Sequence, residues 1–165
     1  MSFGEKGEKA RRQVLGRLPM TLWMWKTLPL AAFAGLRVVR LDEGACAVRL
    51  PGGWRTQNPF RSTYFAAQAM AAEMSTGAPA LVLLEDAPTS VAMLVVGLRA
   101  SYGKKLVGPG TFTFEEVAGM KAAIERAAAS DEAQAFTARS IGRDAAGDVV
   151  GEFEVTWSFK RRRRP

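Results

Sequence analysis

The sequence predicts an α+β fold in which an antiparallel sheet packs against one long, buried helix. Between residues 62 and 76 almost every side chain is small or apolar, which is typical of a helix buried on most of its surface. Apolar and polar side chains alternate from residue 149 to residue 159, which is typical of a half-buried strand. In chain order the patterns give helical segments, two strands, the long helix and about four further strands.

The segments before the long helix are predicted to be two helices and a pair of strands. Residues 5–17 have the pattern of a basic amphipathic helix, and residues 20–34 that of a more apolar one. Strands are expected at residues 36–41 and 45–50, joined by a turn at residues 42–44. The break at residues 51–53 (Pro-Gly-Gly) ends the second strand, and a loop over residues 54–58 leads to the long helix.

The long helix has candidate signals at both ends. Ser62 is expected to cap its start, and Gly77 followed by Pro79 is expected to end it. Residues 81–84 either extend the helix or begin a strand. The later elements are predicted as strands over residues 90–102, 111–116, 133–141 and 149–159, a bulge at Gly97, a short helix over residues 116–129 and a turn over residues 143–148.

Length and composition restrict both the organisation and the chemistry. A chain of 165 residues, 48% of them hydrophobic, predicts one domain over residues 1–165, with a basic extension (1–17), a core (18–160) and a basic tail (161–165). The sequence has no histidine and a single cysteine, Cys46. Serine-triad chemistry, imidazole bases, disulfides within the chain and cysteine-based zinc sites are therefore excluded, and no metal is expected. Any chemistry must use carboxylates, hydroxyls, amides and backbone N–H groups.

The formal net charge is +7, and lysines and arginines gather at both ends of the chain. These ends either solubilise the protein or attract an anionic partner such as the phosphates of coenzyme A or an acidic lipid surface. A nucleic-acid partner is not expected, because no aromatic-basic motif of a known module is present. Charges spread through the first seventeen residues do not fit a signal peptide, so we expect a cytoplasmic protein.

Residues 18–34 form an apolar segment that contains two tryptophans. Pro19, Lys26 and Pro29 interrupt it, which argues against a membrane-spanning helix of about 20 apolar residues. The segment is either a helix packed on the core or on a neighbouring subunit, or a helix that lies at a membrane surface. We favour the first alternative, so contact with a membrane surface is possible but not preferred.

Asn58 and Glu73 are the main candidate functional residues. Asn58 lies in a turn, and Glu73 lies inside the apolar helical segment. A carboxylate in such a helix must be paired, neutral or turned to a cleft, and buried acids of this kind are candidate catalytic groups. Two alternatives remain open: Glu73 pairs with an arginine across a subunit interface, and Asn58, which precedes a proline, serves only to form the turn.

The sequence resembles hotdog-fold acyl-CoA thioesterases of the branch related to phenylacetate-pathway (PaaI-like) enzymes. Within that branch it is most similar to the DUF4442 group, described as tetrameric acyl-CoA thioesterases. The resemblance covers about residues 18–160, and it is carried by the strand from Gly35, the Asn58 turn, the helix ending in Glu73-Met74-Ser75-Thr76-Gly77, and the closing segment at residues 155–160. It implies a sheet wrapped around a central helix, with an N-terminal helical extension, and a homodimer or homotetramer with active sites at the subunit interface.

The chain departs from the PaaI-like pattern at the start of the helix. Arg61 stands where that pattern has glycine, and Tyr64-Phe65-Ala66 replaces His-Gly-Gly. The family's glycines let backbone N–H groups approach the thioester oxygen closely. DUF4442-like sequences commonly lack this tripeptide as well.

The resemblance implies a mechanism and a set of site residues. Glu73 would act as general base or nucleophile, Asn58 would orient water or the carbonyl, and the N–H groups of Phe65 and Ala66 would polarise the carbonyl oxygen. Coenzyme A would enter only as part of the substrate, with no separate cofactor. The residues assigned to substrate binding are Tyr64, Gln68, Met70, Arg99, Lys104 and Lys105.

Rival functions remain open. A non-catalytic hotdog protein that binds acyl-CoA is the first, because the histidine and glycines are missing. A dehydratase ranks lower, since such enzymes usually rely on a histidine. A membrane-surface protein that uses the Trp23/Trp25 segment and the arginine tail is the third.

Overall fold

The computed structural model describes residues 3–162, so the last three residues of the predicted basic tail lie outside the described part. Three helices, a strand pair and the long helix come first along the chain. They are α1 (Glu5–Leu15), α2 (Arg17–Thr27), α3 (Pro29–Ala34), β1 (Arg37–Leu41), β2 (Cys46–Leu50) and α4 (Phe65–Glu85). The rest are β3 (Val91–Tyr102), β4 (Gly110–Phe114), α5 (Val117–Ala129), β5 (Gln134–Asp144) and β6 (Val149–Arg161).

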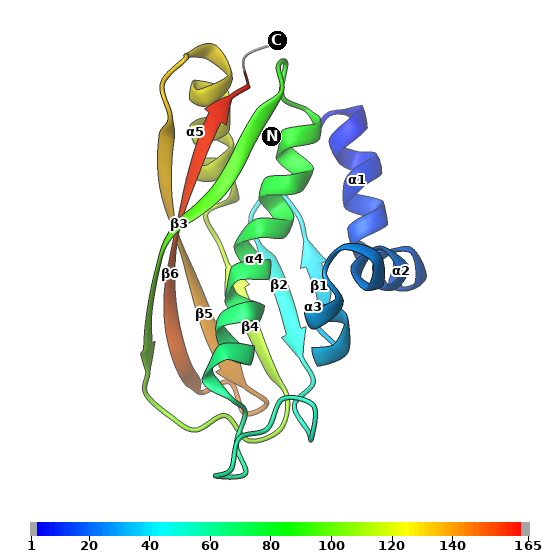
Figure 1. The fold of residues 1–165 in the computed structure, drawn as a ribbon, viewed down its shortest axis with the longest axis vertical. Coiled ribbons are helices and arrows are strands. Elements are labelled where there is room, and N and C mark those ends of the chain that lie inside the picture. The colour runs from blue at the N-terminus through cyan, green and yellow to red at the C-terminus, as the bar shows by residue number, and fades with distance from the viewer. Residues whose placement is uncertain (1–2, 163–165) are drawn as a thin grey trace.

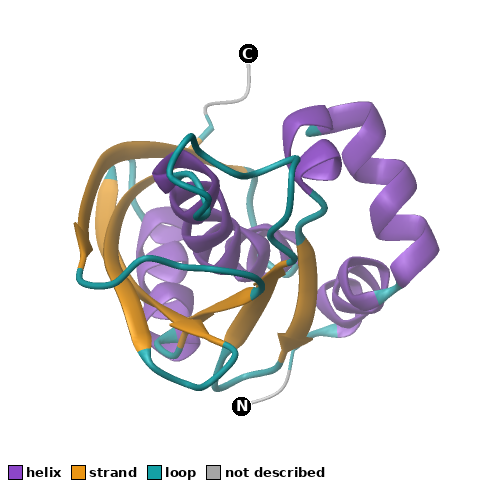
Figure 2. Cartoon of the chain, turned by 90° about the horizontal axis from the view of Figure 1, so that it is seen from below, coloured by secondary structure: helices purple, strands orange, loops and turns teal. Residues whose placement is uncertain are grey.

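The six strands form one antiparallel sheet in the order β1-β2-β4-β5-β6-β3. The sheet curls around α4, while α1, α2 and α3 lie outside it beyond β1 (Figures 1 and 2). The predicted α+β arrangement with a central helix and an N-terminal helical extension is therefore confirmed. The bulge expected at Gly97 is also present, because the pairing of β3 with β6 shifts register between Val95 and Gly97.

The core lies between α4 and the concave side of the sheet. Small side chains on α4 let the helix approach the strands closely, and Ser75 and Ser140 share a buried hydrogen bond of 2.8 Å between their hydroxyl oxygens. Bulky side chains from the sheet fill the space on both sides of the helix. The largest fully buried ones include Phe112, Phe114, Phe153 and Phe159.

The predicted ends of the long helix were wrong. The residue at the N-cap position is Tyr64, whose side chain makes no capping hydrogen bond, and the helix continues through Gly77 and Pro79 to Glu85. Glycine and proline inside a helix cost about 1 and about 3 kcal/mol relative to alanine. Burial of Ala78, Val82 and Leu83 along the same helix outweighs that cost, so residues 81–84 extend the helix.

The apolar helix predicted over residues 20–34 is two helices. α2 ends at Thr27, and Leu28, with φ −135° and ψ 59°, separates it from α3, in which Pro29 is the first residue. Proline disfavours helical geometry in the residue before it and fits well at a helix start, so Pro29 ends one helix and begins the next. None of the helices within residues 3–162 has the length and apolar character needed to cross a membrane.

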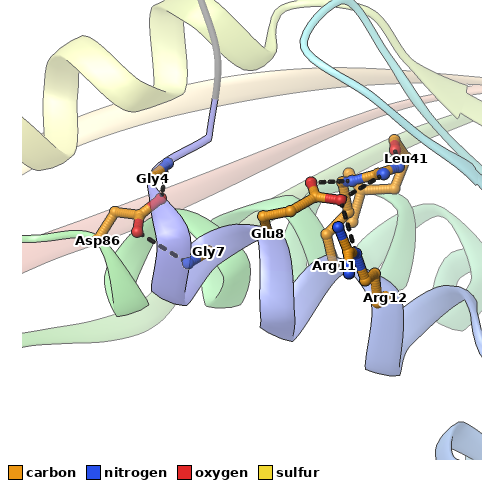
Figure 3. Close-up of polar contacts among 7 residues, drawn as sticks. All are labelled: Gly4, Gly7, Glu8, Arg11, Arg12, Leu41 and Asp86. Atoms are coloured by element: carbon orange, nitrogen blue, oxygen red, sulfur yellow. Dashed lines mark hydrogen bonds and ion pairs between the residues drawn. The ribbon is translucent and has the colours of Figure 1, made fainter.

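Polar contacts fix α1 to the body of the protein (Figure 3). The carboxylate of Asp86, at the end of α4, accepts hydrogen bonds from the N–H groups of Gly4 (2.7 Å) and Gly7 (2.8 Å). At the other end of α1, Arg11 donates to the carbonyl oxygen of Leu41 (3.0 Å) and is held by Glu8. Gly4 has no side chain to cap α1, and Asp86 takes over that task from a distant part of the chain.

Candidate active site

Glu73 lies near the middle of α4 and is partly buried. Its carboxylate makes no hydrogen bond or ion pair with any other residue in the described part of the chain. Burial therefore acts unopposed and raises the pKa of the Glu73 carboxyl above its ordinary value. A carboxylate with a raised pKa is a better proton acceptor than one in bulk water.

Gly77 and Trp157 define the surroundings of this carboxylate. A side-chain carbon added at Gly77, one turn further along α4, would lie 3.2 Å from Oε1 of Glu73 and 3.2 Å from the Trp157 ring. The Trp157 indole N–H donates to the Thr76 hydroxyl (2.9 Å), and that hydroxyl donates to the Glu73 carbonyl oxygen (2.9 Å). The absence of a side chain at Gly77 thus leaves room for both the carboxylate and the indole ring.

The start of α4 presents free backbone donors. The N–H groups of Ala67 and Gln68 donate to the Tyr64 carbonyl oxygen, whereas those of Phe65 and Ala66 have no acceptor within residues 3–162. Such groups at a helix start carry the positive end of the helix dipole and attract a developing oxyanion.

The side chains of Tyr64 and Phe65 are exposed beside these donors, with ring centroids 4.7 Å apart. Tyr102, which the sequence analysis did not single out, joins them from the end of β3. Its hydroxyl donates to the Phe65 carbonyl oxygen (3.2 Å). Only the pairing of β3 with β6 brings this tyrosine to the start of α4, so no local sequence signal could have identified it.

The side chain of Asn58 is engaged within its own loop. Its oxygen accepts hydrogen bonds from the N–H groups of Phe60 (3.0 Å) and Ser62 (3.2 Å), and its nitrogen donates to the Ser62 hydroxyl (3.0 Å). These contacts explain why Ser62 does not cap α4, and they favour the turn-forming alternative for Asn58. Arg61 in the same loop has φ 58°, so the position where the family pattern has glycine keeps the backbone conformation that suits glycine.

Gln68 is buried one turn into α4. Its side-chain nitrogen donates to the Thr63 carbonyl oxygen (3.3 Å), while its side-chain oxygen is buried without a hydrogen-bond partner among the described residues. Met70 is partly buried and packs against the main hydrophobic cluster. These two residues lie between the free N–H groups of α4 and Glu73 in the sequence, and they project from nearly opposite sides of the helix.

The three predicted cationic residues differ in their availability. Lys104 contacts the carboxylates of Asp144 (2.7 Å) and Asp148 (2.6 Å), so its charge is already balanced. Lys105 lies 5.9 Å from the centre of the Phe60 ring, and the exposed Arg99 is 3.9 Å from a carboxylate oxygen of Glu154. Lys105 and Arg99 are therefore the more accessible cations.

The predicted site residues do not come together within one chain. Phe65 and Glu73 are eight residues apart on the same helix, which corresponds to about 12 Å along its axis at about 1.5 Å per residue. A carbonyl oxygen bound at the start of α4 is thus too far from the Glu73 carboxylate of the same chain for direct attack.

No cluster of three or more histidine, cysteine, aspartate or glutamate side chains suited to a metal ion occurs within residues 3–162. Among the described residues the fully buried side-chain atom without a hydrogen-bond partner is Oε1 of Gln68, whereas the unpaired Glu73 carboxyl is partly buried. The site is consequently an acid, a set of backbone donors and an aromatic rim.

Comparison with solved structures places the chain among thioesterase-like folds. A Pseudomonas aeruginosa protein of unknown function described as a probable thioesterase has a TM-score of 0.69 and 19% identity, over 94% of this chain and 95% of that chain. A thioesterase from Haemophilus influenzae has a TM-score of 0.65 and 11% identity, over 88% and 91% of the two chains. A mutant thioesterase from Pseudomonas aeruginosa has a TM-score of 0.66 and 15% identity, over 89% and 96%.

At these identities the similarity establishes the fold, which is the hotdog fold that the sequence predicted. A comparison with curated proteins finds no match. The model of the domain of unknown function DUF4442 matches residues 17–159, which is most of the chain. The protein therefore belongs to the DUF4442 family, and its fold is shared with thioesterases.

Proposed function

We propose that the protein hydrolyses an acyl thioester carried by coenzyme A or by an acyl carrier protein, with Glu73 as the catalytic group. The observation that carries this proposal is the unpaired, partly buried Glu73 carboxylate in the middle of the central helix. A buried charge without a partner is costly for stability, and such a cost is typical of catalytic groups.

The chemistry needs only the groups described above. Ionised Glu73 removes a proton from a water molecule, whose oxygen adds to the thioester carbonyl carbon. The N–H groups of Phe65 and Ala66 stabilise the resulting oxyanion. The carbon–sulfur bond then breaks, and Glu73 returns the proton to the leaving thiolate. In a second route Glu73 attacks the carbonyl carbon itself and the carbon–sulfur bond breaks, which releases the thiolate; water then hydrolyses the anhydride to the free acid and the Glu73 carboxylate.

The separation of about 12 Å along α4 supports a site that is shared by two chains. We propose that Glu73 of one protomer acts on a carbonyl held by the helix start of another. The outer strand β3 supports a homodimer, because it ends the sheet with an unpaired edge and exposes the apolar side chains of Leu94, Val96 and Leu98. Further pairing of dimers would give the homotetramer.

Two altered proteins among the similar structures support the choice of region. In a Staphylococcus aureus protein, a thioesterase, a glutamine and a glutamate were each replaced by alanine, and these positions lie fifteen residues apart. Asn58 and Glu73 have the same spacing, and we propose that Asn58 corresponds to that glutamine. Asn58 would hold the loop before the helix in place and orient the substrate through that loop.

Substrate binding is assigned to the side chains around the helix start. Tyr64 and Phe65 would cover the thioester, and Met70 with Gln68 would line the acyl group. Arg99 and Lys105 would contact the phosphates of coenzyme A, whereas Lys104 would serve mainly to hold its loop through Asp144 and Asp148.

The test is thioester hydrolysis across short, medium, long and aryl acyl-CoAs, with wild type, Glu73→Gln and Glu85→Gln side by side. Glu85 is an exposed glutamate on the same helix, so its variant controls for a general loss of charge. We expect Glu73→Gln to lose at least about a hundredfold in turnover, as for removal of a general base, and Glu85→Gln to keep its activity. Turnover unaffected by Glu73→Gln would contradict the proposal.

A mixing experiment tests the two-chain site. Phe65 is the first residue of α4, where proline is well tolerated, so Phe65→Pro removes one N–H donor while the helix keeps its start. Glu73→Gln and Phe65→Pro are each expected to be inactive. Mixed by unfolding and refolding together, they should regain about a quarter of wild-type activity, because half of the dimers are mixed and each has one intact site. No recovery from dimers that have exchanged chains would contradict a shared site.

A non-catalytic acyl-CoA-binding protein is the second candidate. Bulky residues, Tyr64 and Phe65, stand at the helix start in place of the family's histidine and glycine, and this favours binding over turnover. Acyl-CoA binding measured by calorimetry, without hydrolysis of any substrate, would support this function.

A further inference from the structure

The N-terminal helices present an apolar face that the proposed thioesterase function does not use. On α2 the exposed side chains of Leu18, Leu22 and Trp25 follow the three- and four-residue spacing of one helix face. Met20 and Met24, on the opposite side, are buried against the core. The face continues over the α2–α3 connection, and we call it the helical apolar face: Leu18, Leu22, Trp25, Leu28, Leu30, Phe33 and Trp54.

The exposure of this face is large for apolar side chains. Leu18 and Leu30 are each 69% exposed, and Trp54 is 73% exposed. The Phe33 and Trp54 rings meet edge to face, with centroids 5.8 Å apart, which joins the loop before α4 to the helices. A gathering of exposed apolar side chains on neighbouring helices marks a site of contact with another body.

The segment that carries most of this face contains cations and no acidic residue, while Glu5, Glu8 and Glu85 line clefts that also include Pro19 of α2. From Lys9 to Leu41 the sequence has no aspartate or glutamate and seven lysines and arginines. Arg11, Arg12 and Arg40 form ion pairs with Glu8 or Asp42. The remaining four cations have no ion-pair partner within residues 3–162, and they are Lys9, Arg17, Lys26 and Arg37.

Two of these free cations lie together. Arg17 and Arg37 line the same cleft of about 200 Å³ at the start of α2, on the side where Met20 and Met24 are buried. Lys26 lies near the other end of α2, one residue after Trp25. Cations thus occur near both ends of α2. Their side chains can contact anionic groups of a partner while the apolar side chains are buried against it.

The position of the face in the fold leaves it accessible. Helices α1 to α3 lie beyond β1, and β3 forms the opposite edge of the sheet (Figure 1). A dimer formed through β3 therefore does not cover the helical apolar face. Contacts with Asp86 and Leu41 fix α1 to the body, and the buried side chains of Met20 and Met24 hold α2 against the core.

We propose that the helical apolar face binds the surface of an anionic phospholipid bilayer. Leucine, phenylalanine and tryptophan side chains enter the boundary between headgroups and acyl chains, where tryptophan is favoured, and Arg17 and Lys26, near the two ends of α2, contact lipid phosphates. Charge complementarity selects an anionic membrane as the partner. This binding is independent of thioester hydrolysis, and the helices lie on the membrane without crossing it.

The test is co-sedimentation of the whole protein with vesicles of phosphatidylcholine alone or of phosphatidylcholine with about one third phosphatidylglycerol. We expect binding to the anionic vesicles that weakens as the salt concentration rises. Leu22→Gln with Trp25→Gln should weaken it by at least about tenfold, because two apolar side chains no longer insert. Arg17→Gln and Lys26→Gln should each weaken it by about fivefold.

Val107→Gln is the matched control, because Val107 is 69% exposed, as Leu18 is, but lies outside the helical apolar face. It should bind as wild type does, and circular dichroism should give every variant the helical content of the wild type. Three results would overturn the proposal: no binding to anionic vesicles, equal weakening by Val107→Gln, or binding that survives Leu22→Gln with Trp25→Gln, which would assign it to the basic tail. A loss of oligomerisation in that double variant, without vesicle binding by wild type, would instead identify an interface between copies.

Discussion

Alanine at Gly7 should destabilise the protein even though alanine is the better helix former. A side-chain carbon at Gly7 would lie 2.0 Å from an oxygen of the Asp86 carboxylate, which is closer than the two atoms can approach. The carboxylate must then move away, and it loses its hydrogen bonds to the N–H groups of Gly4 and Gly7. The same substitution should stabilise the protein once Asp86 has been removed.

The two contributions have opposite signs and can be compared. Two hydrogen bonds from a helix start to a carboxylate contribute about 2 kcal/mol together. Glycine to alanine inside a helix contributes about 1 kcal/mol in the stabilising direction. Gly7→Ala in the wild type should therefore cost about 1 kcal/mol, and Asp86→Ala about 2 kcal/mol. In the Asp86→Ala background, Gly7→Ala should gain about 1 kcal/mol, so the coupling between the two positions is about 2 kcal/mol.

The assay is urea unfolding of the wild type, both single variants and the double variant, with the slope of the transition checked for constancy. Thermal midpoints should follow the same order, with about 2–4 °C for each kcal/mol in a chain of this size. The change of sign is the decisive result. If Gly7→Ala stabilises the wild type as it does the Asp86→Ala variant, Asp86 does not cap α1 and the reasoning fails.

Three further predictions concern the interior and the loop before α4. Burial raises the pKa of Glu73, so the folded protein favours the protonated form. The free energy of unfolding of the wild type should therefore fall relative to that of Glu73→Gln as the pH rises above 4.5, the ordinary pKa of this carboxyl group. Equal thermal midpoints of the two proteins at neutral pH would argue against burial as the cause of the raised pKa. Trp157→Phe removes the hydrogen-bond donor to Thr76 and part of a buried ring. It should lower the free energy of unfolding in urea by about 2 kcal/mol. A change near zero would mean that the indole N–H has another partner. Arg61→Gly removes the backbone strain of a non-glycine residue with φ 58°, and it should stabilise the protein by about 0.5–1 kcal/mol. A lower thermal midpoint in calorimetry would instead indicate that the arginine side chain holds the loop.

The sheet and the central helix could be predicted because each carries a repeated local pattern. The alternation along β6 reflects burial on one side of the strand, and the small side chains of α4 reflect burial on most of the helix surface. The ends of α4 could not be predicted in the same way. Pro79 and Gly77 are unfavourable in isolated helices, and only the packing of the finished core makes a helix through them favourable.

The candidate site was predictable only in part. Glu73 was recognised because an acid in an apolar segment is conspicuous in any sequence. The engagement of Asn58 with Ser62 and the balancing of Lys104 by Asp144 and Asp148 depend on side-chain contacts that a sequence pattern does not reveal. Tyr102 reaches the start of α4 only through the pairing of β3 with β6, which joins parts of the chain about fifty residues apart.

The cap on α1 has a consequence for the order of synthesis. Gly7 and Asp86 are 79 residues apart, so at about 5–20 residues per second Asp86 is made about 4–16 s after the helix that it caps. During that interval α1, α2 and α3 have left the ribosome without their anchor, and their apolar side chains have no core to pack against. These helices are consequently made well before the residue that fixes them in place, and a substitution at Asp86 would affect the yield of soluble protein during translation more than the packing around α4.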